Sequence, residues 1–316
     1  MKLDVVVPTY NRSNLLRRTI ASLIQAPIPA GLDVTILIVD NNSKDDTRLV
    51  VKEIQSTTSR TIVYVKEANQ GLSHARNGGI SAGSSEIIGF IDDDEEIHKD
   101  WFTVIAREFA DPATQYIGGP CLPNWESPAP KWLPPGYYSA IGLVLPKPRA
   151  AFGGTFPGIL MGGNAVFRRS IFEIAGRYDT RLGRSGKGLL SDEDAELYRR
   201  LCAANLSGMY VPELVIYHYI PSDRLTKRYF RRWCYWRGAS QGISDRTLKE
   251  PVRYVLGVPL YRIGRAVRGV ASLPQLFLKK EYGLAFSAEL ASWDLIGFIY
   301  GRHFMQIDQF YGKQQS

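Results

Sequence analysis

Asp92, Asp93 and Asp94 directly follow the apolar run of residues 87–91, Ile-Ile-Gly-Phe-Ile, which predicts a buried strand. Three adjacent carboxylates at the tip of a strand repel one another unless a positive charge lies among them. Oxygen ligands of this kind suit Mg²⁺ or Mn²⁺, which bind one or two carboxylates and complete their shell with water and substrate phosphates. A solvated acidic turn before a helix is the alternative, because Asp is ordinary at a helix start. The triplet alone leaves both interpretations open.

A second acidic segment, Ser-Asp-Glu-Asp at residues 191–194, precedes an amphipathic helical pattern. Its serine and its acids are what any helix start prefers, so the residues alone favour a capping role for Glu193 and Asp194. His218 follows the apolar residues 215–217. A lone His beside a strand is more often structural than a metal ligand. Neither feature by itself indicates chemistry.

The first ninety residues alternate between two kinds of pattern. Apolar runs at 3–8, 34–39, 62–65 and 87–91 predict strands, and 3.6-residue periodicity predicts helices over about 14–26 and 72–82. Ser43, with Asp46 three residues later, predicts the capped start of another helix that runs to about residue 55. This alternation is typical of βαβ units and a parallel sheet, in which ligands bind at the carboxyl ends of the strands. Pro8, Thr9, Tyr10, Asp40 and the Asp triplet should therefore share one crevice.

Several short motifs occur in an order that matches a known family. They are Val-Pro-Thr-Tyr-Asn-Arg at 7–12, Val-Asp-Asn-Asn-Ser at 39–43, Asn-Gln-Gly at 69–71 with Ala-Arg-Asn at 75–77, Asp-Asp-Asp at 92–94, Gly-Gly-Asn at 162–164, Gly-Arg-Tyr-Asp at 176–179, and Glu-Asp at 193–194. In this order the chain resembles family 2 glycosyltransferases with the GT-A fold, of the type found in bacterial polysaccharide biosynthesis. The resemblance covers about residues 1–220. No GxxxxGK[ST] loop and no GxGxxG fingerprint is present, so other nucleotide-binding interpretations lack their motifs.

The resemblance implies an α/β fold with a GT-A, Rossmann-like nucleotide-sugar-binding sheet. It implies a metal-dependent, inverting glycosyltransferase of the hexosyltransferase type that uses Mn²⁺ or Mg²⁺. The donor would be a nucleoside-diphosphate sugar, with a UDP-sugar as first choice, and the acceptor a hydroxyl of a saccharide or a lipid-linked molecule. The alternative is a non-catalytic nucleotide-sugar-binding or scaffold protein with the same fold.

The resemblance also assigns roles to residues. Asp194 matches the family's base, with Glu193 as second choice, and Asp92 and Asp94 would hold the metal together with His218. Donor binding falls to ten positions, with Asp92 serving in both roles: Pro8, Thr9, Tyr10, Arg12, Asp40, Arg76, Asp92, Asp93, Arg231 and Arg232. Gly162, Gly163 and Asn164 would line the acceptor or sugar pocket. Without the resemblance, Asp40 could be a turn former, Arg76 a solvated helix residue, and the glycines a strand-end bulge.

Charge divides the chain at about residue 220. Residues 1–220 hold 23 Lys and Arg against 24 Asp and Glu, whereas residues 221–316 hold 16 against 7. We therefore expect a glycosyltransferase domain over 1–220 and a basic, aromatic-rich helical extension over 221–316. Arg231 and Arg232 could clamp the diphosphate. The surrounding Tyr-Phe-Arg-Arg-Trp at 229–233 lacks the glutamine of the Gln-x-x-Arg-Trp motif, which argues against a processive polymerase.

A helical pattern from Leu260 onward separates basic from apolar residues. Arg262, Arg265 and Arg268 fall within an arc of roughly 120°. Leu260, Ile263, Val267 and Val270 lie opposite them. Such a helix could lie on an anionic membrane surface, or it could pack on the protein with its arginines in water. Nucleic acid is not expected as a partner, because no recognised nucleic-acid motif accompanies the basic residues.

Composition sets the remaining expectations. Three scattered cysteines, at 121, 202 and 234, suit buried reduced thiols. The first residues lack the pattern of a signal peptide, and no run of 18 apolar residues occurs, so we expect a cytoplasmic protein, either soluble or peripheral on the inner face of the cell membrane. Residues 121–157 are rich in proline and aromatic residues and predict an ordered covering loop near the acceptor side.

Overall fold

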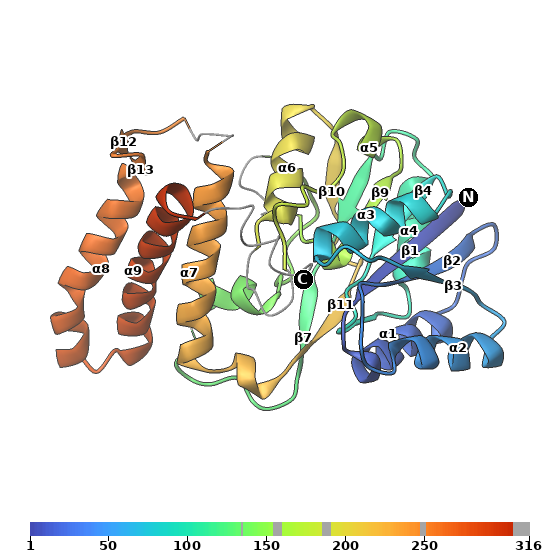
Figure 1. Cartoon of the computed structure of the whole chain (residues 1–316), viewed down its shortest axis with the longest axis horizontal. Coiled ribbons are helices and arrows are strands. Elements are labelled where there is room, and N and C mark those ends of the chain that lie inside the picture. Colours follow the sequence, from blue (N-terminus) through green and yellow to red (C-terminus); the bar gives the residue numbers. More distant parts are fainter. Residues whose placement is uncertain (134, 154–159, 185–190, 247–250, 306–316) are drawn as a thin grey trace. The chain divides into compact units, whose positions relative to one another are not determined.

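A computed structural model of the chain describes residues 1–133, 135–153, 160–184, 191–246 and 251–305 (Figure 1). These residues form two compact units. The first unit contains Met1–Asn124, Gly142–Thr180 and Glu193–Tyr219. The second contains Trp125–Ile141, Arg181–Asp192 and Ile220–Ser316. The sequence suggested a division at residue 220, and the structure also assigns two earlier segments, Trp125–Ile141 and Arg181–Asp192, to the second unit.

An eight-stranded sheet organises the first unit, in the order β3-β2-β1-β4-β9-β6-β10-β8. Strands β1 (Lys2–Thr9), β2 (Asp33–Asp40), β3 (Thr61–Lys66) and β4 (Ile87–Phe90) run parallel, which confirms the predicted βαβ arrangement. Thr9 lies opposite Asp40 at the carboxyl ends of β1 and β2. The remaining strands are β6 (Tyr116–Gly118), β8 (Ala150–Ala151), β9 (Ala165–Arg168) and β10 (Gly208–Tyr210). Strand β9 is antiparallel to both β4 and β6, so the sheet is mixed beyond β4.

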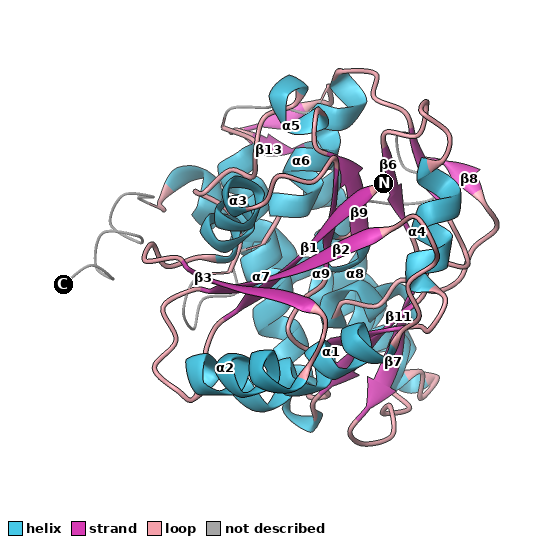
Figure 2. Ribbon diagram, turned by 90° about the vertical axis from the view of Figure 1, so that its right-hand side faces the viewer, coloured by secondary structure: helices cyan, strands magenta, loops and turns pink. Residues whose placement is uncertain are grey.

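Helices cover both faces of this sheet. Figure 2 shows α1 (Ser13–Gln25) and α2 (Thr47–Thr57) on one side of β1–β3 and α3 (Leu72–Ala82) on the other. The unit also contains α4 (Trp101–Phe109), α5 (Ile171–Ile174) and α6 (Glu193–Ala203). The core packs side chains of α3 and α6, such as Ala75 and Leu201, with the strand residues Val6, Phe90 and Phe167. The close approach of α3 to β1 requires glycine at Gly79, where a Cβ would lie 2.3 Å from a methyl group of Val6.

The predicted capping box at Ser43 was wrong. Helix α2 begins at Thr47, and Asp46 precedes it without a side-chain cap bond. The Ser43 side chain instead accepts a hydrogen bond from the Asn11 N–H, and its own N–H donates to Asp40. Ser43 therefore holds together the loops that follow β1 and β2, and it is unavailable to start the helix.

A second sheet has three strands in the order β5-β11-β7, and β5 follows β4 directly in the sequence. It contains β5 (Glu95–Ile97), β11 (Ile216–Ile220) and β7 (Cys121–Trp125), and His218 lies opposite Glu95 across the antiparallel β5–β11 pair. The region expected to be one irregular loop, 121–157, thus begins with a strand, and it continues with the short 3₁₀ helix η1 (Pro135–Ile141). Pro123 fits because β7 is at the edge of this small sheet. Residues 134 and 154–157 of the expected loop lie outside the described residues.

Three long helices dominate the second unit: α7 (Lys227–Ser244), α8 (Leu260–Leu278) and α9 (Tyr282–His303). Helix α9 packs on both α7 and α8. Glycine permits the α7–α9 contact, because a Cβ on Gly297 would lie 1.8 Å from the Tyr235 carbonyl oxygen and one on Gly301 would lie 2.0 Å from that of Ala239. A short hairpin, β12 (Tyr254–Val255) and β13 (Val258–Pro259), leads into α8. No helix within the described residues is long and apolar enough to cross a membrane.

Asp294 of α9 ties the three helices together. Its carboxylate is buried and accepts hydrogen bonds from Arg237 of α7 and from Arg262 and Arg265 of α8, at 2.6–3.0 Å. The expectation that the α8 arginines face either lipid or water was therefore wrong for Arg262, which is buried, and Arg265 also turns towards Asp294. A buried carboxylate on the neighbouring helix provides a stronger partner than water can, and periodicity within α8 carries no information about it.

Candidate active site

The Asp triplet meets the loop after β1. Arg12 donates from one Nη to Asp93 at 2.9 Å and to Asp94 at 2.8 Å, and the Thr9 hydroxyl donates to Asp93 at 2.8 Å. Asp93 raises the pKa of Arg12 through its charge. Burial raises the pKa of Asp93 to about 6, although Arg12 opposes the shift. Thr9 and Arg12 thus hold the carboxylates of Asp93 and Asp94 in place.

Arg76 joins the triplet to the second acidic segment. Its side chain, only 1% exposed on α3, donates to Asp194 at 2.7 Å and to Asp92 at 3.2 Å, and lies 3.5 Å from Glu193. The guanidinium also stacks over the ring of Tyr178, 5.1 Å from its centre. Burial lowers the pKa of Arg76, but the charges of Asp194 and Asp92 outweigh burial and raise it well above the ordinary value. Residues 92 and 194, far apart in sequence, therefore lie on the two ends of one fork.

Asp194 lies in the first turn of α6 with its carboxylate largely buried. Burial raises its pKa, while Arg76 and the Gly162 N–H act in the opposite direction. Glycine is required at residue 162, because a Cβ there would lie 2.2 Å from a carboxylate oxygen of Asp194 and 2.6 Å from the Arg76 guanidinium. The Gly-Gly-Asn motif thus makes room for the Asp194–Arg76 pair.

Behind the triplet, Glu95 accepts a hydrogen bond from the Asp92 N–H at 2.8 Å. The Nε2 of His218 lies 3.4 Å from a carboxylate oxygen of Asp94. Three residues each offer one possible ligand atom, and these atoms lie within 4.8 Å of one another: they belong to Glu95, Cys121 and His218. Burial, then Asp92 and Asp94, raise the pKa of Glu95, and burial and Glu95 raise the pKa of the Cys121 thiol. The Cys121 thiol donates toward Glu95 at 3.9 Å, and Asp94 and His218 offer a second pair of metal-binding atoms beside this group.

The charges of this cluster do not balance among the described residues. Two guanidiniums, those of Arg12 and Arg76, face six carboxyl groups: Asp92, Asp93, Asp94, Glu95, Glu193 and Asp194. A carboxylate oxygen and an imidazole nitrogen 3.4 Å apart form a donor set that suits Mn²⁺ better than Mg²⁺, which prefers oxygen alone. The residues present therefore fit a divalent cation.

The predicted donor-side residues cluster at the ends of β1 and β2. Asp40 is buried and accepts hydrogen bonds from the Ser43 N–H at 2.8 Å and the Tyr64 hydroxyl at 2.6 Å. Burial and Asp40 together raise the pKa of Tyr64 to about 12. Pro8 lies opposite Val39 in the β1–β2 register, and Tyr10 is partly exposed in the turn that follows. Asp40 is thus already held by protein groups, which gives it a fixed orientation.

Asn41 helps to position the site, although the sequence analysis named it only as part of a turn motif. Its amide accepts from the Gly71 N–H at 2.7 Å and from Gln70, and donates to the Asn69 carbonyl at 2.6 Å. These bonds fix the start of α3, the helix that carries Arg76. The polar turn motifs Asp-Asn-Asn at 40–42 and Asn-Gln-Gly at 69–71 were the available signal, since such turns contain side chains that hydrogen-bond to nearby backbone.

Asn164 has structural bonds on both ends of its amide. It accepts from the Trp101 indole N–H at 3.0 Å and donates to the carbonyls of Pro120 and Leu214. Gly163 leaves space for Glu95, whose carboxylate would lie 2.4 Å from an added Cβ. Residues 162–164 thus shape the site from behind, and a direct contact with sugar stays a prediction.

Arg231 and Arg232 belong to the second unit, on α7. Arg231 donates to both carboxylate oxygens of Glu289, at 2.5 and 2.9 Å, and the Arg232 side chain is exposed. The structure thus gives Arg231 a partner on α9, and the diphosphate role of both residues stays a prediction.

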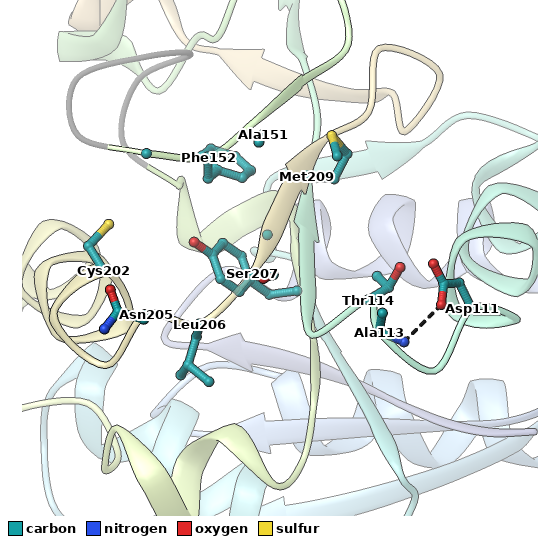
Figure 3. A pocket seen from close by; sticks show the side chains of 13 residues that line it. Asp111, Ala113, Thr114, Ala151, Phe152, Cys202, Asn205, Leu206, Ser207 and Met209 are labelled. Atoms are coloured by element: carbon teal, nitrogen blue, oxygen red, sulfur yellow. Dashed lines mark hydrogen bonds between the residues drawn. The ribbon is translucent and has the colours of Figure 1, made fainter.

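A pocket of about 570 Å³ lies elsewhere in the first unit. Figure 3 shows Phe152, Cys202, Leu206 and Met209 around it, with Asp111 and Thr114 at one side. None of the predicted site residues lines this pocket. The pocket therefore adds nothing to the carboxylate cluster.

The family model for glycosyl transferase family 2 matches residues 4–174. The chain belongs to this family. The glycosyltransferase is 26% identical over 237 residues to the succinoglycan biosynthesis protein ExoM of Rhizobium meliloti, covering 73% of this chain and 72% of that one. It is also 26% identical over 259 residues to a glucosyl-dolichyl phosphate glucuronosyltransferase of Haloferax volcanii, covering 78% and 77%.

A solved structure supports the fold of the glycosyltransferase. The mannosyltransferase PcManGT from Pyrobaculum calidifontis, in complex with GDP-Man and Mn²⁺, superposes with a TM-score of 0.64. The match covers 96% of this chain and 88% of that one at 17% identity. The predicted GT-A fold and the predicted enzyme class are thus confirmed.

Proposed function

We propose that this glycosyltransferase is metal-dependent and inverting, and that it transfers a sugar from a nucleoside-diphosphate sugar to a hydroxyl of a saccharide or lipid-linked acceptor. The observation that carries this proposal is the Arg76 fork, which holds Asp92 of the triplet and Asp194 of α6 on opposite ends. Metal-dependent inverting transfer needs an acidic metal ligand on the leaving-group side and a base on the acceptor side of one sugar. The fork supports such a pairing.

Asp94 and His218 are the residues that we expect to hold the metal, with Asp92 nearby. The 3.4 Å between their ligand atoms and the excess of carboxylates support this assignment. A bound Mn²⁺ would act as a Lewis acid that stabilises the negative charge on the departing diphosphate. Arg12, already bonded to Asp93 and Asp94, fixes both carboxylates before any ligand arrives.

Asp194 is the group that we expect to take the proton from the acceptor hydroxyl. The acceptor oxygen would then form its bond to the anomeric carbon while the bond from that carbon to the diphosphate oxygen breaks on the opposite face. Burial that raises the pKa of Asp194 supports this role, since a base is most effective when its pKa approaches the working pH. Gly162 leaves the carboxylate space, and Arg76 gives it a fixed direction.

The donor's nucleotide would lie at the ends of β1 and β2. Asp40 is held by Ser43 and Tyr64, so its orientation toward a base or ribose would be set before binding. Tyr10 is partly exposed and could stack on the base. The name of the Haloferax relative supports a lipid-linked acceptor, and that of the Rhizobium relative supports a saccharide acceptor.

The experiment is a donor panel with product analysis. UDP- and GDP-sugars are incubated with Mn²⁺, with and without saccharide and polyprenyl-phosphate-sugar acceptors, and release of nucleoside diphosphate is followed. We expect one donor to be turned over, and NMR of its product to show the anomeric configuration opposite to that of the donor. Retention of configuration would contradict the mechanism. Nucleotide-sugar binding without turnover for any donor would favour the non-catalytic alternative.

A further inference from the structure

The outer face of α8 is apolar and exposed. Five residues form this outer stripe, namely Leu260, Val267, Val270, Ala271 and Leu278. At 3.6 residues per turn they lie within an arc of about 100°. Val267 is 62% exposed and Leu278 is 85% exposed. A helix of a water-soluble domain normally turns such a stripe inward.

The opposite face of α8 is the one that packs. Arg262 and Ala266 are buried, and a Cβ added to Gly269 would lie 2.6 Å from the Ala288 carbonyl oxygen of α9. The bonds of Arg262 and Arg265 to Asp294 fix the rotation of the helix about its axis. Helix α8 already packs on α9 through its opposite face, and the bonds to Asp294 keep it in that orientation. The outer stripe therefore points away from α9.

Apolar exposure continues at both ends of the helix. At the turn into α9, Phe277 is 55% exposed, and Tyr282 and Leu284 follow with similar exposure. At the other end, Leu256 forms the tip of the β12–β13 hairpin and is 90% exposed. Figure 1 shows the hairpin and the α8–α9 turn at opposite ends of the same long helix. Exposed apolar side chains thus extend beyond the stripe at both ends of α8, and together they form an exposed strip with more members than the single exposed side chains of an ordinary surface.

The charges around this strip are mostly positive. Residues 251–280 contain six basic side chains and no acidic one, and Glu281 follows at the turn into α9. Five of the basic side chains are exposed, those of Arg253, Arg265, Arg268, Lys279 and Lys280, and Glu281 is exposed as well. A second copy of this surface would bring like charges together. A bilayer with anionic lipids offers both an apolar interior for the strip and negative headgroups for its basic border.

We propose that the outer stripe of α8, with the two apolar tips, is a membrane-docking surface that inserts among the lipids of an anionic bilayer. The inserting side is the apolar face, and Arg262 and Arg265 are internal ties rather than lipid contacts. Exposed Lys279 and Lys280 would stay at the headgroup level while the neighbouring Phe277 and Leu278 enter the acyl region. Docking needs neither a donor sugar nor turnover, so it stands or falls separately from the proposed function.

The experiment is vesicle binding by the full chain without donor or metal, on vesicles of phosphatidylcholine alone and with phosphatidylglycerol. We expect binding to the mixed vesicles that weakens but persists at high salt, since only its electrostatic part is screened. The double variant Val267→Glu, Leu278→Glu should bind at least about tenfold more weakly, because burial of such side chains in lipid is worth that much each. The matched control is Leu49→Glu, at a 65% exposed position on α2, which should bind as the parent does.

A second measurement locates the inserted surface. A polarity-sensitive dye on Leu278→Cys should shift to the blue with vesicles, while the same dye on Leu49→Cys should not, after correction for labelling of the parent thiols. Equal binding by the double Glu variant and the parent would overturn the proposal, as would absence of binding to both vesicle types. Lipid-independent dimerisation that the double Glu variant abolishes would assign the strip to a second copy and would also overturn it.

Discussion

Each unit contains a buried cluster of ion pairs, which we call a knot. The first knot has more carboxylates than guanidiniums, and the second has more guanidiniums than carboxylates. In the first unit one guanidinium, that of Arg76, meets the carboxylates of Asp92, Glu193 and Asp194. In the second unit one carboxylate, that of Asp294, meets three guanidiniums from α7 and α8. Both clusters are built from ion pairs, but an arginine is at the centre of the first and an aspartate is at the centre of the second.

The surroundings decide what each knot can do. Asp294 is fully buried, whereas Arg265 keeps about half of its side chain in water, so the excess positive charge is hydrated. In the first unit the excess is negative, and it grows with the neighbouring Asp93, Asp94 and Glu95. Burial raises the pKa values of Asp93, Glu95 and Asp194, the direction expected for carboxyl groups that are withdrawn from water. The composition of the first knot fits the cation that we propose, and in the second knot Asp294 links three helices.

The largest expected effect is on turnover. Asp194→Asn keeps the shape of the side chain and its contact with Arg76 but removes the proton acceptor. We expect kcat to fall by roughly 10²- to 10⁴-fold, the scale of a lost general base, while nucleotide affinity persists. The measurement is steady-state transfer with the donor that the panel identifies.

Glu196→Gln is the matched control for that variant. Glu196 lies on the same helix and pairs with Arg200 four residues later. It should retain nearly full activity. If Asp194→Asn also retained it, the base would be Glu193 or another group.

The next effect is on stability and tests the second knot. Asp294→Asn leaves the buried Arg262 and the partly buried Arg237 with a neutral partner. We expect the second unit to lose about 3–5 kcal/mol of unfolding free energy, the usual penalty for breaking a buried pair. Urea denaturation followed by circular dichroism measures this loss, with the exposed Glu281→Gln as control. A change below about 0.5 kcal/mol would show that Asp294 is not a tie.

Sequence patterns revealed the first knot better than the second. Family motifs named Asp92, Arg76 and Asp194 separately, and strand order alone placed Asp40 and the triplet at one edge of the sheet. That Arg76 bridges Asp92 and Asp194 was not predictable, because it depends on how α6 packs beside α3. For α8, periodicity separated arginines from apolar residues correctly. It could not tell which face is buried, since Asp294 lies 26 residues or more beyond those arginines.

A smaller effect concerns pH. A raised pKa means that Asp194 stays protonated to higher pH than an ordinary aspartate, so it becomes a competent base only above that pKa. With donor and metal saturating, kcat should therefore rise with pH through a limb above the ordinary value of 3.8. Rate measurements between about pH 4 and pH 8 locate this limb. A rate already constant at the acid end would mean that burial does not govern the base.

Calorimetry of nucleoside-diphosphate binding tests most directly whether the carboxylate knot is completed by a cation. Titrations use the same protein with Mn²⁺ and after chelation, together with Asp94→Asn. We expect affinity to fall at least about tenfold after chelation, since the diphosphate then meets a carboxylate-rich cluster with no metal ion between them. Asp94→Asn should show little further dependence on Mn²⁺. Equal affinity with and without the metal would contradict the account.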